Sequence, residues 1–282
     1  PVSTLDGTFE GTSITATNIS SLDTSIVTSA VGTFKDSGIS AASDITSWDV
    51  TNVTNMSRMF ENAVNFTNDI STWDISNVTD MSSLFKGATL FNADLSIWAS
   101  DVVGVTNMSN MFANNVLFNQ DLSLWDTSTV KDMAHMFDTT GSFNQDLGAW
   151  DVSLVSNMDS MFSAAGQFDQ DITEWCVSLI PTEPAAFSTG TPLQTVNKPN
   201  WGKCSNTSQI HYYKDTFNSL GLRVQGTATA AGVVKNPDGT TISIGPGNFD
   251  IKLGAGNNYG YYEMPMEIIT KLTFGSSSVH QN

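Results

Sequence analysis

Two short apolar clusters recur along the middle of the chain, separated by polar turns of nearly constant length. The first cluster ends at a tryptophan, as in residues 122–125, and the second begins at a valine, as in residues 130–133. Both are too short for helices and predict strand pieces of three or four residues. The Met–Phe pair that follows, as in Met136 and Phe137, predicts a single helical turn.

The tryptophans set the period of this pattern. Intervals of 25, 25, 27, 25 and 25 residues separate Trp48, Trp73, Trp98, Trp125, Trp150 and Trp175. A fixed period between 20 and 50 residues is typical of a solenoid, in which each unit buries its apolar face only against its neighbours. We therefore predict about six rungs stacked about 4.8 Å apart, with the tryptophans forming one internal ladder and the phenylalanines two more. A ligand-binding aromatic strip would need these rings outside, yet no other large apolar residues are available to fill the interior.

The one irregular interval follows Trp98. There, residues 99–104 add two positions to the unit. An insertion confined to a turn leaves the stack intact. We interpret it as a bulge in a turn, with a contact loop as the alternative.

Aspartates also recur with the period and predict columns of carboxylates. One column precedes the first apolar cluster and a second follows the tryptophan; they comprise Asp69, Asp94, Asp121, Asp146 and Asp171, and then Asp49, Asp74, Asp126 and Asp151. Carboxylates one rung apart repel by about 1 kcal/mol per pair even in water, so the fold must compensate. We expect each side chain to accept backbone N–H bonds within its own turn. The alternative is a row of calcium sites between rungs, which would need six to eight oxygens per ion.

Charge narrows the range of partners. Residues 44–176 hold eighteen acidic side chains against Arg58, Lys86 and Lys131, a net charge of −15 within a total of −17. Such a surface repels phosphate backbones and anionic lipids, so we expect neither nucleic acid binding nor membrane insertion. No segment is long and apolar enough to span a bilayer, and the first thirty residues do not resemble a signal peptide. Together with Pro1, these features favour synthesis in the cytosol without a cleaved leader.

The repeated phrases resemble a known family. Val-Thr-Asp-Met-Ser at residues 78–82 and Phe-Asn-Gln-Asp-Leu at residues 118–122 are similar to the 25-residue surface-protein repeats first noticed in mycoplasma lipoproteins and related to BspA-like leucine-rich repeats. The resemblance covers about residues 45–176. It implies an open, curved or slightly twisted β-solenoid with a surface-exposed role in adhesion or display, and it implies no catalysis. The chain departs from the family in lacking a lipobox cysteine and in carrying a distinct C-terminal region.

The resemblance extends to the end of the array. Family arrays often close with a Trp-Cys pair, a proline-containing loop and a second Trp-to-Cys stretch, which correspond here to residues 175–176 and 201–204. Cys176 and Cys204 are the only cysteines. Two cysteines cannot form a structural zinc site alone, and no partnership with His and Asn is visible, so we expect a cap disulfide rather than a nucleophile.

These features predict four segments. Residues 1–40 form an N-terminal arm and cap, 41–176 the solenoid, 177–204 a disulfide-closed cap, and 205–282 a β-rich anchoring or oligomerisation domain. In the last segment, residues 222–225 and 240–244 flank a turn sequence at 236–239. Further strands are expected at 249–253 and 267–274. The fold class is thus mainly β, a leucine-rich-repeat-like solenoid followed by a small β domain.

No motif of a known chemistry emerges from the sequence. It contains no phosphate loop, dinucleotide fingerprint or serine-hydrolase elbow, and the three histidines stand in unrelated contexts. We expect no catalytic residue, no cofactor and no metal, calcium in the aspartate columns being the alternative.

These expectations define a non-enzymatic structural or display protein. Its setting is predicted to be the surface of a virion, as a bacteriophage decoration, fibre or tail component involved in attachment. The alternative is a secreted bacterial or algal adhesin at the cell surface, and a carbohydrate-active enzyme is a remote third. Expected partners are other structural proteins and further copies of the chain, bound through residues 205–282 and the N-terminal arm, with a host receptor or glycan on the array. Because residues 205–282 carry five basic and five acidic side chains, they can associate without net repulsion.

Overall fold

The structure is a computed structural model that describes residues 2–14 and 19–204, together with the backbone of seven strands within residues 205–282. The chain divides into two compact units, Pro1–Cys204 and Ser205–Asn282. The boundary lies directly after Cys204, where the repeated pattern ends. Each unit is described by itself.

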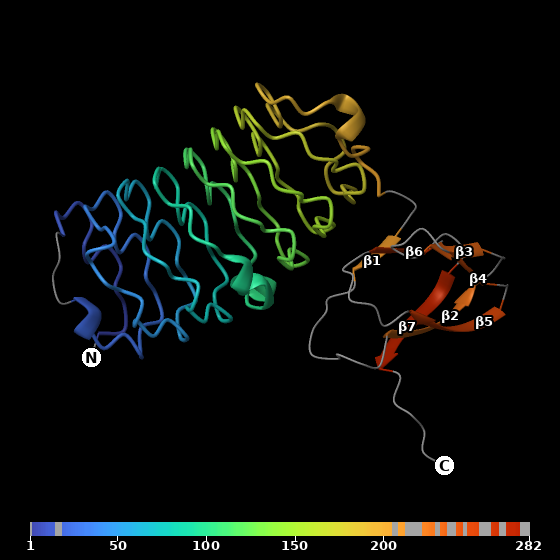
Figure 1. The fold of residues 1–282 in the computed structure, drawn as a ribbon, viewed down its shortest axis with the longest axis horizontal. Coiled ribbons are helices and arrows are strands. Elements are labelled where there is room, and N and C mark those ends of the chain that lie inside the picture. Colours follow the sequence, from blue (N-terminus) through green and yellow to red (C-terminus); the bar gives the residue numbers. More distant parts are fainter. Residues whose placement is uncertain are drawn as a thin grey trace, which may run out of the picture. The chain divides into compact units, whose positions relative to one another are not determined.

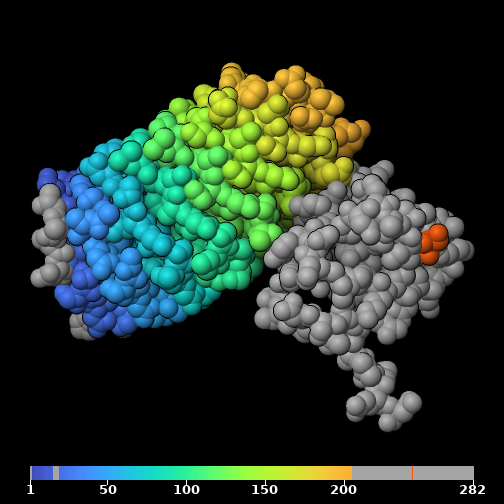
Figure 2. Space-filling model, in the orientation of Figure 1, coloured from blue at the N-terminus to red at the C-terminus, as the bar shows by residue number. Residues whose placement is uncertain are grey.

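Successive coils of the first unit lie side by side and run parallel to one another (Figure 1). Single-residue parallel bridges connect them at a spacing of one unit; the bridging residues are Thr4, Ser29, Asn55, Asp80, Asn107, Asp132 and Asn157. In space-filling form the coils follow one another as bands across the face in view (Figure 2). The stacking therefore begins with Thr4 and Ser29, inside the segment predicted to be an N-terminal arm and cap.

The first apolar cluster of each unit forms a turn, so the predicted strand piece is wrong there. The Trp125 N–H donates to the Leu122 carbonyl at 3.1 Å, which closes the chain over residues 122–125. The preceding carboxylate starts this bend, because Asp121 Oδ1 accepts the Ser123 N–H at 2.8 Å. In the second cluster, residues 130–133, Asp132 alone forms parallel β-bridges, to Asn107 in the preceding coil and Asn157 in the following one.

The segment containing the Met–Phe pair is a run of tight turns, and the predicted helical turn is also wrong. Three consecutive i to i+3 hydrogen bonds start at Met133, His135 and Phe137. His135 and Thr139 have φ of 57° and 59°. A left-handed residue at every fourth position cannot continue a right-handed helix. The described helices of this unit are instead short 3-10 segments: η1 Ile19–Ser21, η2 Ser96–Ser100, η3 Val102–Gly104 and η4 Thr195–Asn197.

This turn geometry frees every second peptide N–H for the neighbouring coil. His135, Phe137 and Thr139 donate to the carbonyls of Asp159, Met161 and Ser163 at 2.8, 2.8 and 2.6 Å. Met133 adds a fourth bond to the Asn157 carbonyl. The same ladder of four bonds recurs between most coils, for example from Met56, Arg58, Phe60 and Asn62 to Asp80, Ser82, Leu84 and Lys86. Hydrogen bonds between coils therefore take the place of extended strand ladders.

Aromatic rings fill the interior in two columns of phenylalanines. In the first, Phe34, Phe60, Phe85, Phe112, Phe137 and Phe162 stack with ring centroids 5.6 to 5.8 Å apart. Phe66, Phe91, Phe118, Phe143 and Phe168 form the second column, and each of them contacts one ring of the first column at 3.9 to 4.1 Å. All of these rings are buried, as are the adjacent methionines. The core is thus continuous along the array.

The second unit consists of two antiparallel sheets. Its strands are β1 Ser208–His211, β2 Leu222–Ala228, β3 Gly232–Lys235, β4 Thr241–Ile244, β5 Gly247–Leu253, β6 Tyr261–Met264 and β7 Ile269–Ser276. One sheet has the order β1-β6-β3-β4 and the other β5-β2-β7. Thus β4 pairs with β3, whereas residues 222–225 belong to β2 and pair with β5 and β7. The predicted turn at residues 236–239 lies outside the described residues.

Candidate interaction surface

The six tryptophans of the repeats lie beneath the outer surface of the array, and all of them are buried. Five indole N–H groups donate to a backbone carbonyl of the preceding coil; the pairs are Trp48 with Ile19, Trp73 with Ile45, Trp125 with Leu95, Trp150 with Leu122 and Trp175 with Leu147. Among the described residues, the Trp98 Nε1 has no such partner. Each bonded indole therefore ties one coil to the next.

The tryptophans contact phenylalanines more than one another. Trp73, Trp98 and Trp150 lie 6.2 to 6.4 Å from Phe60, Phe85 and Phe137, respectively. Within the described part of the chain, only Trp98 and Trp125 form a stacked tryptophan pair, at 6.5 Å. The tryptophans therefore occupy equivalent places in the stack without forming a continuous ring-to-ring column.

On the outside, the first column of aspartates is engaged within its own turns. In Asp69, Asp94, Asp121, Asp146 and Asp171, one Oδ1 accepts the N–H two residues later, at 2.8 to 3.0 Å. Asp44 does the same with Thr46 at 3.0 Å. This arrangement is the Asx turn expected from the sequence, and its N–H donors offset the repulsion between stacked carboxylates.

The second column follows the same rule. Asp49, Asp74, Asp126 and Asp151 accept the N–H two residues later at 2.9 to 3.0 Å. A third column, which the sequence reasoning missed, consists of the bridging residues Asn55, Asp80, Asn107, Asp132 and Asn157, which form the same turn. Because this column mixes Asn and Asp, the spacing of the aspartates alone does not predict it.

Hydrogen bonding lowers the pKa of several of these carboxyl groups. The Thr46 and Ser76 hydroxyls, followed by the N–H groups of the same residues, hold the pKa of Asp44 and Asp74 below the ordinary aspartate value. For Asp69 the Ser71 N–H is the larger cause of the lowered pKa and the Ser71 hydroxyl the second. These carboxylates are therefore anions that serve as turn-forming acceptors.

The described residues include no group of three or more His, Cys, Asp or Glu side chains that could hold a metal ion. Among the described residues, no helix is long and apolar enough to cross a membrane. The calcium alternative thus finds no multidentate cluster in the described aspartate columns.

A polar column that the sequence reasoning did not single out connects four successive later coils. The Asn119 side-chain oxygen accepts the Asn144 N–H and the Gln145 side-chain N–H, both at 2.9 Å. Asn92 and Asn144 accept equivalent bonds from the coils that follow them. The repeated Phe-Asn-Gln-Asp phrase could have predicted this column. The Asn side-chain oxygen of one copy accepts hydrogen bonds from the backbone N–H of the Asn or Asp, and from the side-chain N–H of the Gln, in the next copy.

Charged side chains form a further column along the turn segment. Lys35 Nζ lies 2.6 Å from Glu10, and Glu61 lies between Arg58 Nε at 2.6 Å and Lys86 Nζ at 3.5 Å. In a later coil, half-exposed His135 contacts Asp138 at 2.9 Å. Lys35, Arg58 and Lys86 are thus already paired with acids.

Two apolar areas interrupt this polar surface. Val64, Leu90, Val116 and Leu117 lie at neighbouring positions of one turn in three consecutive coils and are 42 to 47% exposed. Near the two-residue insertion, Ile97 and Val103 are 63% and 44% exposed, and Leu124 of the following coil is 42% exposed. The insertion lies in η2 and η3, whose Trp98 and Val102 are buried, so it packs against the core while Ile97 and Val103 face outward.

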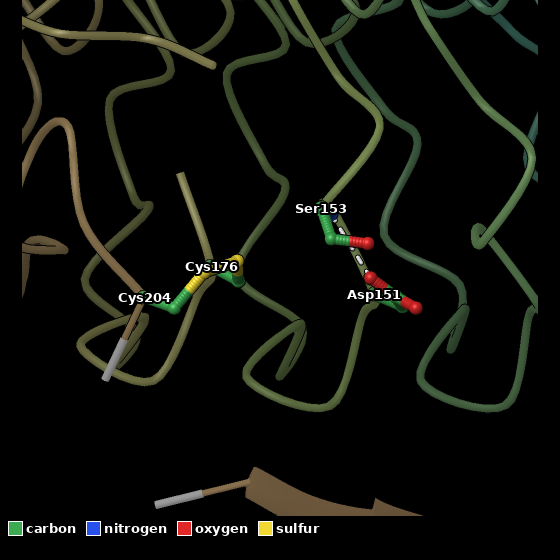
Figure 3. The surroundings of a disulfide bond; sticks show 4 residues. All are labelled: Asp151, Ser153, Cys176 and Cys204. Atoms are coloured by element: carbon green, nitrogen blue, oxygen red, sulfur yellow. Dashed lines mark hydrogen bonds between the residues drawn. A yellow bond between two sulfur atoms is a disulfide. The ribbon is translucent and has the colours of Figure 1, made fainter. Parts of the chain in front are cut away.

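The disulfide lies at the end of the array. Cys176 occupies the position that Asp151 holds in the preceding coil, where Asp151 accepts the Ser153 N–H, and it is bonded to Cys204 (Figure 3). Backbone bonds on both sides hold the same two segments together: Val177 N–H donates to Lys203 at 2.9 Å, and Gly202 N–H to Ile180 at 2.8 Å. Phe187 meets Phe162 edge-on and Trp201 at 5.0 Å, which closes the aromatic column.

Fold and surface together define a protein built from stacked repeats. The family model described as "Mycoplasma protein of unknown function, DUF285" matches residues 1–98 and again residues 99–201. The chain therefore belongs to this mycoplasma-type repeat family. No curated protein and no solved structure matches it.

Proposed function

We propose that the protein is a non-enzymatic structural protein that displays a leucine-rich-repeat-like β-solenoid, related to the BspA-like repeats, from a larger assembly. The observation that carries this proposal is the repetition of the outer surface. Two columns of aspartate Asx turns, and a third that mixes Asn and Asp, present the same turn geometry from coil to coil. Repeated equivalent positions suit multivalent contact with an extended surface, whereas catalysis needs a constellation that occurs once.

The division of the chain supports separate roles for its two units. Residues 44–176 carry a net charge of −15, whereas residues 205–282 balance five basic side chains with five acidic ones. Copies of the acidic face repel one another at low ionic strength, but the second unit can associate without this penalty. We therefore assign attachment to a larger assembly to residues 205–282, and display to the array.

For the setting, we propose a virion surface, where such a protein would act as a decoration, fibre or tail component. The match to a family described from Mycoplasma favours a second setting, the cell surface, where the protein would serve as an adhesin. Both settings require an array that is exposed and an end that is anchored.

Separate expression of residues 1–204 and 205–282 tests the division of roles, since these are the two compact units. We expect the second unit alone to form multimers of defined mass by light scattering. We expect immobilised residues 1–204 to bind intact host cells or a glycan array, with binding weakened by salt. A second unit that stays monomeric and an array that binds no surface would refute the proposal.

A further inference from the structure

Within the turn segment, the backbone hydrogen bonds between coils run from each coil to the following one. Bonds in the opposite direction, such as Thr54 N–H to the Thr28 carbonyl and Gly38 N–H to the Thr12 carbonyl, lie at the ends of the segment. In most coils, four peptide N–H groups of this segment donate to carbonyls of the following coil, and three do so at the last junction, to the cap; Phe34 donates to Met59, for example, and Phe60 to Leu84. A stack built in this way ends in two different edges. One edge presents unused carbonyls, and the other presents unused N–H groups.

The first coil presents the carbonyl edge. Its Gly7, Phe9 and Gly11 N–H groups donate to the second coil, at 2.8 to 2.9 Å. The carbonyls of Asp6, Thr8 and Glu10 stand where the second coil has the acceptors Val31, Thr33 and Lys35, and no described residue donates to them. The half-buried Phe9 ring stacks on Phe34 at 5.2 Å and ends the aromatic column.

The cap presents the N–H edge. Ser160, Phe162 and Ala164 donate to the carbonyls of Ala185, Phe187 and Thr189, so the cap continues the ladder. The equivalent next donors are Ala186, Ser188 and Gly190, whose N–H groups have no acceptor among the described residues. Ala186 and Gly190 have φ of 52° and 82°, and the corresponding Ser160 and Ala164 have φ of 54° and 52°. The backbone is therefore already in the conformation that pairs with a further coil.

We propose that the cap of one copy stacks on the first coil of another copy, head to tail. The Ala186, Ser188 and Gly190 N–H groups of the first copy donate to the Asp6, Thr8 and Glu10 carbonyls of the second, in the register that already joins neighbouring coils. Such a heterologous contact leaves a free edge at each end, so it propagates into filaments unless it closes into a ring. Unpaired N–H and C=O groups at the edge of a β-sheet are a template for pairing with another chain, and the two ends of this stack present unpaired groups of the same kind.

Charge and hydrogen-bond polarity both favour this arrangement over the symmetric ones. Two first coils would bring carbonyl edges together, and two caps would bring N–H edges together, so neither can form the ladder. Residues 2–34 contain Asp6, Glu10 and Asp23 and no basic side chain, whereas residues 177–204 contain Lys198, Lys203 and Glu183. The net side-chain charges of −3 and +1 therefore attract across a head-to-tail contact.

The register also predicts which side chains meet. Thr189 occupies in the cap the position that Glu10 and Lys35 occupy in the first two coils, because each donates its N–H to the residue three positions earlier. Glu10 and Lys35 of neighbouring coils form an ion pair at 2.6 Å. Thr189 of one copy should therefore lie beside Glu10 of the next, and both residues are exposed.

Cysteine cross-linking of the full-length chain tests this contact. Glu10→Cys and Thr189→Cys are made as separate proteins, mixed and oxidised with glutathione, and the linked peptides are identified by mass spectrometry. We expect a mixed disulfide between positions 10 and 189, formed faster than either symmetric one. The matched control is Asn65→Cys, an exposed position in the middle of the array, which should link to neither. Equal rates for all pairs, or a preference for 10–10 linkage, would overturn the proposal.

A charge series at the same position gives a second readout that does not depend on cross-linking. We expect Thr189→Lys to tighten association by roughly two- to fivefold at low salt and Thr189→Glu to weaken it by a similar factor, the range that exposed ion pairs produce. Association is measured by sedimentation velocity over a concentration series. The Asn65→Lys and Asn65→Glu variants carry the same charge changes away from the edge. Identical responses at positions 189 and 65 would contradict an edge contact, and this outcome is independent of whether residues 205–282 multimerise.

Discussion

Replacement of single tryptophans by phenylalanine separates the contribution of the indole hydrogen bond from that of packing. Trp150 and Trp98 are both buried, but Trp150 Nε1 donates to the Leu122 carbonyl at 2.9 Å, whereas Trp98 Nε1 has no partner among the described residues. Trp150→Phe removes a hydrogen bond that contributes about 1 kcal/mol net. Trp98→Phe removes instead a buried donor whose unsatisfied state costs about 1 to 3 kcal/mol.

The loss of packing is common to both substitutions and largely cancels in their comparison. We therefore expect Trp150→Phe to lower the free energy of unfolding by about 2 kcal/mol more than Trp98→Phe does, summing the two hydrogen-bond terms. For a unit of this size, that difference corresponds to about 4 to 8 °C in Tm. Trp175→Phe, which loses a 2.9 Å bond to the Leu147 carbonyl, should behave like Trp150→Phe.

The assay is urea unfolding followed by circular dichroism, with a matching m-value required for each variant, because repeat arrays can unfold in parts. Hydrogen exchange of the coils around each site reports the local effect if the transition is not cooperative. If Trp98→Phe destabilised the array as much as Trp150→Phe, the unpaired indole would not be a local weakness, and the assignment of hydrogen bonds between coils would be incorrect.

Three further predictions concern the core, the cap and the acidic columns. Trp125→Ala should cost about 3 to 5 kcal/mol, as truncation of a large buried aromatic does; efficient acrylamide quenching of native tryptophan fluorescence would contradict that burial. Reduction of the Cys176–Cys204 bond, which spans 28 residues, should destabilise the cap by about 3 to 4 kcal/mol on the chain-entropy estimate; intact mass with and without alkylation checks the bond, and two alkylatable thiols in the native protein would remove the claim. The folded-state pKa of Asp44, Asp69 and Asp74 is lowered, so their stabilisation is present above the unfolded aspartate pKa of about 4 and is lost as pH falls through the folded value. Urea midpoints should therefore drop in acid, and less steeply in Asp74→Asn, which keeps the turn; an unchanged slope in that variant would argue against the Asx turn as the cause.

The period, the buried aromatic columns and the Asx turns could be predicted from the sequence because each depends on residues that repeat with it. The conformation of the turn segment could not, because the left-handed positions hold residues as different as Arg58, Ser83, Asn110 and His135. What these positions share is a positive φ angle, which the identity of their side chains does not predict. The sequence predicts a helical turn in this segment because Met and Phe are compatible with one. The hydrogen bonds to the next coil, which favour the observed turns instead, join residues about 25 positions apart and cannot be predicted from the local sequence.

The first coil shows why the spacing of the tryptophans predicts too short an array. Residues 2–14 contain no tryptophan, so a search keyed to that residue begins at Trp48. Leu5 and Phe9 nevertheless supply the packing positions, and Gly7 and Gly11 supply the left-handed ones, at φ of 59° and 66°. Glycine adopts a positive φ at both positions without strain, because it has no Cβ atom.

The regular bonding between coils makes the length of this protein adjustable in discrete steps. Each coil offers the next one the same acceptors and donors, so duplication or loss of one 25-residue segment in the gene would preserve every junction on either side. One added copy would move the two ends of the array apart by about 5 Å. The number of copies can therefore act as a molecular ruler, which evolution can lengthen or shorten without redesigning either end.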